Sequence, residues 1–397
     1  MPLTAFSMRP ARLAGMTGIG VDRMGDLADA AGGADVLRLE NLDTDVPPLA
    51  AALEATRQAI VDDASNSYLP FVGQPRLRRA VAAHVARLSG APCDGERNVL
   101  ISAGGLSGIL NVLLALVDTG DEVVLTDPTY VGLINRVRLA GGVPRLVPFV
   151  PDRGGWTLDR DALRRAVTPK TRAFLLMSPS MPSGGVLTRD DWLAVADLVR
   201  EHGLWLIHDT AMQRILFDGR PLVDPAGLPD MAERTITVGS ASKELRLIGW
   251  RVGWIVAPER LVPDLALVSM GNVVVPVGIG QAAAAVALEA GDDDVARATA
   301  TWQARRDLIL SELEGLPVIR PGGGWSLLID GKALGMTGAA MSKHLFDEAR
   351  IAATPMTGWG EVNGAQFLRL VFTNEPVERL RGIGDKTRRA WRRRAGD

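Results

Sequence analysis

The strongest constraint on the fold is an alternation of short apolar runs with helical stretches between about residues 98 and 257. The runs are four to six residues long, rich in Val, Ile and Leu, and mostly continuous rather than alternating with polar residues, which is typical of strands covered on both faces. Strands that alternate with helices pair mainly in parallel. We therefore expect an α/β fold whose mostly parallel, doubly wound sheet has seven strands. The predicted strands are Val99–Ser102, Val123–Thr126, Arg145–Phe149, Ala173–Ser178, Trp205–Asp209, Thr235–Gly239 and Gly253–Ala257.

One intervening helix has clear start and stop signals. Thr188 is a suitable N-cap, and Asp191 follows three residues later as its capping-box partner. Gly203 predicts the end of the helix. The inward face is expected to carry Trp192, Val195, Leu198 and Val199.

The last third of the chain has a different pattern. We expect one long helix from about Ala285 to Glu314. The elements expected after it are a strand at Trp325–Ile329, a helix near Gly338–Ala349 and a strand at Gln366–Phe372. This pattern predicts a large domain over residues 51–284 and a smaller α+β domain formed by residues 1–50 with 285–397. The C-terminal basic run is interpreted as the solvated end of the last helix, where cations are favourable; it comprises Lys386, Arg388, Arg389, Arg392, Arg393 and Arg394.

Composition excludes several classes of function. The chain has 397 residues, which suits a large core with a smaller partner domain. Its formal charge of −2 gives no reason to expect nucleic acid or a membrane as partner. Cys93 is the only cysteine and there are four scattered histidines, so neither a disulfide nor a metal site is expected. The N-terminus has no long apolar core, and we expect a cytoplasmic protein.

Two strand ends carry groups suited to binding charged ligands. The segment Gly104-Gly105-Leu106-Ser107 joins a strand to an apolar helix, where backbone N–H groups and the helix dipole attract anions. A plain tight turn is the alternative. Asp209 ends another strand, where ligands of doubly wound sheets bind, and its carboxylate could pair with a cationic ring nitrogen. A helix N-cap is the alternative there.

A lysine and an arginine complete this set. Lys243 follows a buried strand within Ser240-Ala241-Ser242-Lys243, and a lysine there is costly unless it has a partner or a covalent role. Lysine amines form Schiff bases with carbonyl compounds. Arg251 comes eight residues later and suits a phosphate. An anion turn, an acid, a lysine and an arginine at strand ends predict a site for a phosphorylated aldehyde cofactor.

Over nearly its whole length the chain resembles the class I/II aminotransferases of fold type I. Ser240-Ala241-Ser242-Lys243 and Gly249-Trp250-Arg251-Val252-Gly253 are similar to the specific family signature Ser-x-Ser-Lys…Gly-x-Arg-x-Gly. The resemblance implies pyridoxal 5′-phosphate (PLP) held by Lys243 as a Schiff base. It implies that Ser240 and Arg251 hold the phosphate, with backbone contacts from Gly105 and Leu106. It also implies that Asp209 pairs with the pyridinium nitrogen.

Both tyrosines of the chain fall on positions that the resemblance makes functional. Tyr68, in Tyr68-Leu69-Pro70-Phe71-Val72-Gly73, is similar to the family tyrosine that reaches the phosphate of a neighbouring subunit, which implies a homodimer with composite active sites. Tyr130, in Asp127-Pro128-Thr129-Tyr130, matches the aromatic that stacks on the cofactor ring. Arg369 matches the arginine that binds the substrate α-carboxylate. Trp325 and Trp359 are candidates for lining the side-chain pocket.

The chain departs from the family pattern in three places. Met181 stands where an asparagine usually donates to the phenolic oxygen (O3′) of PLP, and Met212 stands where a tyrosine usually does. The family Gly-x-Pro near the start appears as Leu42-Asp43-Thr44. Thioethers cannot donate hydrogen bonds. A water molecule, Ser178 or Ser180 could supply the missing donor.

Four functions are compatible with parts of these patterns. The first is transamination of an L-amino acid or a metabolite derived from one. The second is PLP-dependent elimination, decarboxylation or oxidative deamination in specialised metabolism. The third, a penicillin-binding serine hydrolase, would use Ser240-x-x-Lys243, but the further motifs that it needs are missing. The fourth, an aminotransferase-like regulator, needs a DNA-binding domain for which the residues before Leu42 leave no room.

Overall fold

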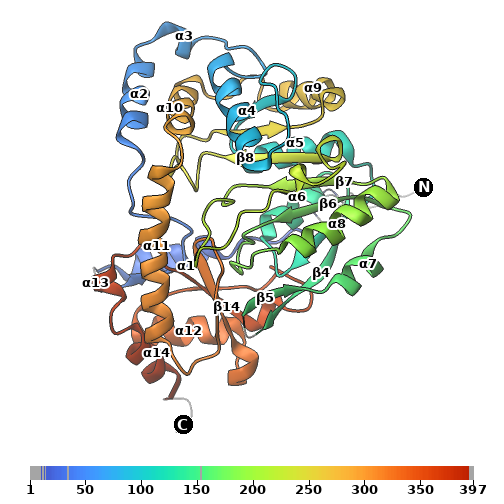
Figure 1. Cartoon of the computed structure of the whole chain (residues 1–397). Coiled ribbons are helices and arrows are strands. Elements are labelled where there is room, and N and C mark those ends of the chain that lie inside the picture. The colour runs from blue at the N-terminus through green and yellow to red at the C-terminus, as the bar shows by residue number, and fades with distance from the viewer. Residues whose placement is uncertain (1–9, 11–12, 14, 34, 153, 393–397) are drawn as a thin grey trace, which may run out of the picture.

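The computed structural model describes residues 10, 13, 15–33, 35–152 and 154–392 (Figure 1). Their main feature is a central sheet of eight strands in the order β2-β9-β8-β7-β6-β3-β4-β5. Strands β9 and β5 run antiparallel to their neighbours, and the other strands are mutually parallel. The strands are β2 (Val99–Ser102), β3 (Glu122–Asp127), β4 (Val143–Asp152), β5 (Gly155–Leu158), β6 (Thr171–Met177), β7 (Trp205–Asp209), β8 (Thr235–Ser240) and β9 (Gly253–Val256).

The predicted α/β sheet is confirmed, with one strand more than expected. All seven predicted runs form strands, and the eighth, β5, pairs with an extension of β4 beyond Phe149. This extension contains Pro151. A proline is acceptable near the edge of a sheet, but it normally argues against a strand, so the end of β4 and its partner β5 were not predicted from the sequence.

Helices cover both faces of the sheet, as Figure 1 shows. Alternate residues of a strand point to opposite faces. Leu100 and Ile255 therefore pack with helices α5 and α9 on one face, whereas Ile101 and Trp254 pack with α4 and α10 on the other. The helices of this part are α2 (Ala50–Ile60), α3 (Asp63–Asn66), α4 (Pro75–Ser89), α5 (Gly105–Leu116), α6 (Val131–Leu139), α7 (Arg160–Ala166), α8 (Arg189–His202), α9 (Val262–Asn272) and α10 (Gly278–Glu289).

Helix α8 has the start and end that its sequence predicts. Thr188 is the N-cap and forms a complete capping box with Asp191. Gly203 ends the helix in the left-handed conformation, with φ of 65°. The four residues predicted on its inward face are buried.

A second, smaller group of elements contains a four-stranded antiparallel sheet in the order β10-β11-β14-β13 and a two-stranded pair, β1 with β12. Helices α1, α12 and α14 belong to this part. The bounds are α1 (Val21–Ala31), β1 (Leu37–Arg38), β10 (Val318–Ile319), β11 (Ser326–Asp330), α12 (Gly338–Ala349), β12 (Ile351–Ala352), β13 (Thr354–Pro355), β14 (Phe367–Val371), α13 (Val377–Leu380) and α14 (Ile383–Arg392). The division at residues 50 and 285 stays a prediction, and Arg393 and Arg394 of the basic run lie outside the described residues.

The single long helix expected from Ala285 to Glu314 is wrong. The chain forms α10, which ends at Glu289, and α11 (Asp293–Glu312). Between them Gly291 has a φ of 83°, which an α-helix cannot contain. Asp292 is fixed at this break by ion pairs with Arg87 and Arg214, two residues that are distant in the sequence.

Candidate active site

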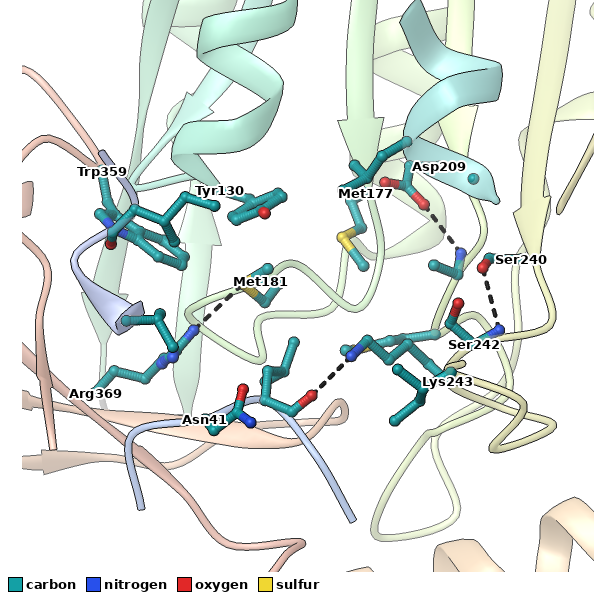
Figure 2. A pocket seen from close by; sticks show the side chains of 18 of the residues that line it. Asn41, Tyr130, Met177, Met181, Asp209, Ser240, Ser242, Lys243, Trp359 and Arg369 are labelled. Atoms are coloured by element: carbon teal, nitrogen blue, oxygen red, sulfur yellow. Dashed lines mark hydrogen bonds between the residues drawn. The ribbon is translucent and has the colours of Figure 1, made fainter. Parts of the chain in front are cut away.

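A cavity of about 330 Å³ opens at the carboxyl ends of the parallel strands. Neighbouring strands bring their ends together there: Met177 at the end of β6 pairs with Asp209 at the end of β7, and Asp209 pairs with Val238 in β8. In Figure 2, Arg369 and Trp359 lie on one side of the cavity, Asp209, Ser240 and Lys243 lie on the other, and Met181 lies between the two groups.

Lys243 is a partly buried amine in the turn after β8. Its Nζ donates a hydrogen bond to the main-chain oxygen of Leu42 at 2.8 Å and lies 4.8 Å from the ring centroid of Trp325. Burial lowers the pKa of Lys243 to about 8; the negative charge of Asp43 opposes this shift, and the positive charges of Arg369 and Arg251 add to it. A lysine with a lowered pKa is more often the neutral amine, which is the nucleophilic and basic form.

Asp209 is a buried carboxylate on the same side of the cavity. Its Oδ1 accepts a hydrogen bond from the main-chain N–H of Ala211 at 3.0 Å. Burial raises the pKa of Asp209 to about 6. The positive charge of Arg136 opposes this rise only in part, and no direct ion pair with Asp209 forms among the described residues. A cationic group placed in the cavity would relieve this burial cost.

The glycine turn before α5 forms a narrow cradle beside Arg251. Gly104 has a φ of 88°, and α5 begins at Gly105. A Cβ on Gly253 would lie 2.5 Å from the backbone nitrogen of Gly105, so only glycine allows this close approach. Arg251 donates to the main-chain oxygen of Ile248 at 2.9 Å, and it has no carboxylate partner within the described chain. A helix start and an uncompensated guanidinium can together bind an anion.

Arg369 is a second cation without a carboxylate partner among the described residues. It comes from β14 and is 1% exposed. Its Nη2 donates to the main-chain oxygen of Glu40 at 2.5 Å, its guanidinium lies 5.0 Å from the ring centroid of Trp359, and its Nε has no hydrogen-bond partner. Burial lowers the pKa of Arg369 to about 10. A carboxylate in the cavity would supply the missing charge.

Of the residues predicted for the site, only Tyr68 and the candidate Trp325 do not line this cavity. Tyr130, at the N-cap of α6, packs against Trp359 with ring centroids 5.3 Å apart. Tyr68 is 86% exposed and lies in the loop after α3, away from the cavity of its own chain. The lining residues that were predicted are Gly105, Leu106, Tyr130, Asp209, Ser240, Lys243, Arg251 and Arg369.

The departures from the family pattern also fall in the cavity. Met181 and Met212 both line it, and Met177 adds a third thioether. The Sδ of Met181 lies 3.9 Å from Nη1 of Arg369. Ser178 and Ser180, the alternative donors, are buried and are not among the lining residues.

Several lining residues were missed by the sequence reasoning. Asn41 comes from the loop after β1, and Ile19, Val21 and Asp22 come from the start of α1. None of these residues belongs to a recognisable motif, so the sequence contains no signal that would have placed them at the site. Trp359, named only as a candidate, lines the cavity.

The fold and the site together define the class of protein. A doubly wound sheet with a lysine, a carboxylate and an anion cradle at its strand ends is typical of the fold type I α/β enzymes. The comparisons give the family: the model for aminotransferase class I and II matches residues 34–382, and the chain belongs to this family.

Relatives in both sequence and structure agree with this assignment. A probable N-succinyldiaminopimelate aminotransferase from Mycobacterium tuberculosis is 36% identical over 320 residues, 80% of each chain. An arginine–pyruvate transaminase from Pseudomonas aeruginosa is 33% identical, covering 88% of this chain and 89% of the relative. The solved N-succinyldiaminopimelate aminotransferase from Mycobacterium tuberculosis has a TM-score of 0.87 at 32% identity, with 98% of this chain and 99% of that chain covered.

The described residues contain neither a membrane-spanning helix nor a cluster of metal ligands. None of the helices there has the length and apolar character needed to cross a membrane. No group of three or more His, Cys, Asp or Glu side chains among these residues could hold a metal ion.

Proposed function

We propose that the protein is a PLP-dependent aminotransferase that acts on an L-amino acid or an amino-acid-derived metabolite, with Lys243 as the residue that holds the cofactor covalently. The observation that carries the proposal is the position of Lys243. Its amine, with a pKa of about 8, lies in one cavity with an uncompensated carboxylate, Asp209, and two uncompensated cations, Arg251 and Arg369.

The cavity fits PLP in charge and in shape. Arg251, Ser240 and the backbone of Gly105 and Leu106 would hold the phosphate, because they form the anion cradle at the start of α5. Asp209 would pair with the protonated ring nitrogen and thereby recover the cost of its burial.

Tyr130 and Arg369 would position the other parts of the complex. Tyr130 would lie against the cofactor ring, and Arg369 would bind the substrate α-carboxylate with its guanidinium. Figure 2 shows Arg369 and Lys243 on different sides of the cavity. The substrate carboxylate would therefore lie beside Arg369 and Trp359, opposite Lys243.

PLP supplies an electron sink for bonds at the substrate Cα when it is bound. The residues of the chain would supply orientation and proton transfer. Lys243, once its amine is free, would take the proton from the substrate Cα and deliver it to the C4′ carbon of the cofactor. A pKa near 8 keeps a useful fraction of the amine neutral at neutral pH.

We also propose a homodimer in which Tyr68 reaches the phosphate site of the neighbouring subunit. The support is a set of exposed apolar residues in the Tyr68 loop and in the segment from α9 to α10, because exposed apolar surfaces mark protein contacts. Gly278 lies close to Ser65 and Leu69, which brings Val277 to the Tyr68 loop. We call this set the Tyr68 surface: Tyr68, Phe71, Leu267, Met270, Val274 and Val277.

Two of the thioethers in the cavity favour a second candidate function. Met181 and Met212 replace the usual hydrogen-bond donors, so control over which Cα bond breaks would differ from that in ordinary aminotransferases. A PLP-dependent lyase, decarboxylase or oxidative deaminase of specialised metabolism on the same fold is therefore the alternative. Such an enzyme would need no oxo-acid acceptor.

One experiment tests the central proposal and a second separates the alternatives. Borohydride reduction of the PLP-loaded protein should leave a pyridoxyl group on Lys243, detected by peptide mass spectrometry, and Lys243→Ala should abolish it. A protein that binds no PLP at Lys243 is not this enzyme. A spectral screen of amino acids, with and without pyruvate or 2-oxoglutarate, then distinguishes transamination from the alternative. We propose the cytoplasm as the location.

A further inference from the structure

Five charged side chains of the described residues line the cavity. Three are cations, Lys243, Arg251 and Arg369, and two are carboxylates, Asp22 and Asp209. The proposed function, on which this inference rests, gives four of them a partner: Lys243 the cofactor, Arg251 the phosphate, Asp209 the ring nitrogen and Arg369 the α-carboxylate. Asp22 remains without one.

Asp22 lies at the mouth of the cavity, in the first turn of α1. Its side chain is exposed, and no described residue donates a hydrogen bond to it or forms an ion pair with it. Burial raises the pKa of Tyr130, and the negative charge of Asp22 adds to that rise. The carboxylate of Asp22 therefore interacts electrostatically with the hydroxyl of Tyr130, and both residues line the cavity.

The segment before Asp22 is fixed to the wall of the cavity. Trp359 donates from Nε1 to the main-chain oxygen of Ile19 at 3.1 Å. Asn135 in α6 donates to the main-chain oxygen of Thr17 at 2.8 Å, and Arg138 donates to that of Gly15 at 2.6 Å. A charge on a tethered segment has a defined position relative to a bound ligand, as substrate selection requires.

The surroundings of Asp22 in the cavity are apolar. Ile19 and Val21 precede it in the sequence and line the cavity, as do Trp359 and Met181, whereas Arg23, which follows it, does not. Beyond the three cations already assigned, no lysine or arginine of the described residues lines this space. A substrate group that extends beyond the Cα would therefore meet apolar walls and one negative charge.

We propose that Asp22 is a specificity-determining residue that selects substrates by the charge at the far end of their side chain. Amino acids whose side chain ends in a cation are favoured, neutral ones are accepted, and those ending in a carboxylate are disfavoured. In transamination the amino group moves from the amino acid to a 2-oxo acid, which becomes the new amino acid, and both pairs use the same cavity. The preferred acceptor is therefore a 2-oxo monocarboxylate such as pyruvate rather than a 2-oxo dicarboxylate.

A purely structural role of Asp22 makes a different prediction. An acidic residue in the first turn of a helix is stabilised by the helix dipole, which would account for Asp22 without any ligand. Replacing it would then lower the stability of α1 and leave the order of ligand affinities unchanged. Binding of ligands that differ only at their far end separates the two roles.

The test uses calorimetric binding to the PLP-loaded protein of three acids that have a five-carbon chain and no α-amino group: 5-aminopentanoate, pentanoate and glutarate. The wild type should bind them in that order of decreasing affinity. Asp22→Asn should weaken 5-aminopentanoate about fivefold, the effect of one solvent-accessible ion pair. It should leave pentanoate unchanged and tighten glutarate. Asp26→Asn, four residues further along α1 and outside the cavity, is the matched control and should change none of the three.

Two results would overturn the role of Asp22. One is glutarate as the tightest ligand of the wild type, and the other is an Asp22→Asn variant that changes all three affinities equally or not at all. Turnover of arginine, leucine and aspartate with pyruvate or 2-oxoglutarate gives a second readout of the same order. Borohydride labelling of Lys243 keeps the two proposals apart: labelled protein with the wrong order refutes only the inference on Asp22, and unlabelled protein refutes the proposed function.

Discussion

The amine of Lys243 donates a hydrogen bond to the main-chain oxygen of Leu42 at 2.8 Å, although 201 residues separate them in the sequence. The acceptor is neutral, so the charge of the lysine is only partly compensated. Burial, together with the charges of Arg369 and Arg251, lowers the pKa of Lys243 to about 8. Without cofactor, this residue should therefore destabilise the fold whenever it is protonated.

Lys243→Met should stabilise the cofactor-free protein at neutral pH and lose this advantage at high pH. The folded-state pKa of about 8 lies below the ordinary lysine pKa of 10.5, so the unfolded chain binds more protons between these values. The contribution of Lys243 to the free energy of unfolding therefore rises with pH in this window, by roughly 2–3 kcal/mol. Urea unfolding of both proteins at pH 7 and pH 10.5 measures the difference. If the free energies of unfolding of the wild type and of Lys243→Met differ by the same amount at both pH values, the pKa of Lys243 is normal.

Arg369→Lys should weaken the binding of amino acids and of their 2-oxo acids without loss of PLP. A lysine keeps the positive charge but cannot make the paired contacts of a guanidinium with a carboxylate. We expect the apparent affinity to fall by about tenfold to a hundredfold, as for one lost charged hydrogen bond. Spectral titration with amino acids measures the change, and the absorbance of bound PLP is the control. An unchanged affinity would remove Arg369 from the carboxylate site.

The Tyr68 surface should hold two subunits together. Leu267 is 63% exposed on α9, and Leu267→Asp would place a charge in the interface without disturbing the core. We expect this variant to sediment as a monomer and to bind PLP less tightly, because Tyr68 could no longer reach a neighbouring phosphate. Val362→Asp, at an apolar residue that is 78% exposed and far from this surface in the sequence, is the control. A wild type that is active as a stable monomer would contradict the composite site.

Local patterns allowed most of the sheet and of the candidate site to be predicted. Asp209 and Lys243 stand at or just after the ends of apolar runs, and the carboxyl ends of such runs meet at one edge of the sheet. Arg251 precedes β9, which runs antiparallel to β8 and therefore begins at the same edge. The capped helix α8 is equally local. The resemblance to a family added Arg369 and the two tyrosines, whose positions no strand pattern gives.

Contacts between distant segments escaped prediction. Asp22 reaches the cavity because Asn135 and Trp359 hold the segment before it, and no periodicity in the sequence indicates this pairing. The break between α10 and α11 depends on Arg87 and Arg214, which hold Asp292 from outside the helix. Both features depend on tertiary contacts that become visible only in the folded chain.

Met181 and Met212 should make the absorbance of bound PLP insensitive to pH in the neutral range. Both thioethers line the cavity, and neither can donate a hydrogen bond to the phenolic oxygen of the cofactor. That oxygen would then hold the proton that it shares with the Schiff-base nitrogen of Lys243 more tightly than in a site with donors. The double variant Met181→Asn with Met212→Tyr restores the donors and should bring a spectral transition into the slightly acidic range.

Titration of the absorbance of the two PLP-loaded proteins measures this difference. Met177→Leu, a change in the third lining thioether that introduces no donor, is the control and should keep the wild-type spectrum. A wild type that already shows the acidic transition would mean that a water molecule supplies the hydrogen bond. The two methionines would then give no reason to favour elimination, decarboxylation or oxidation over transamination.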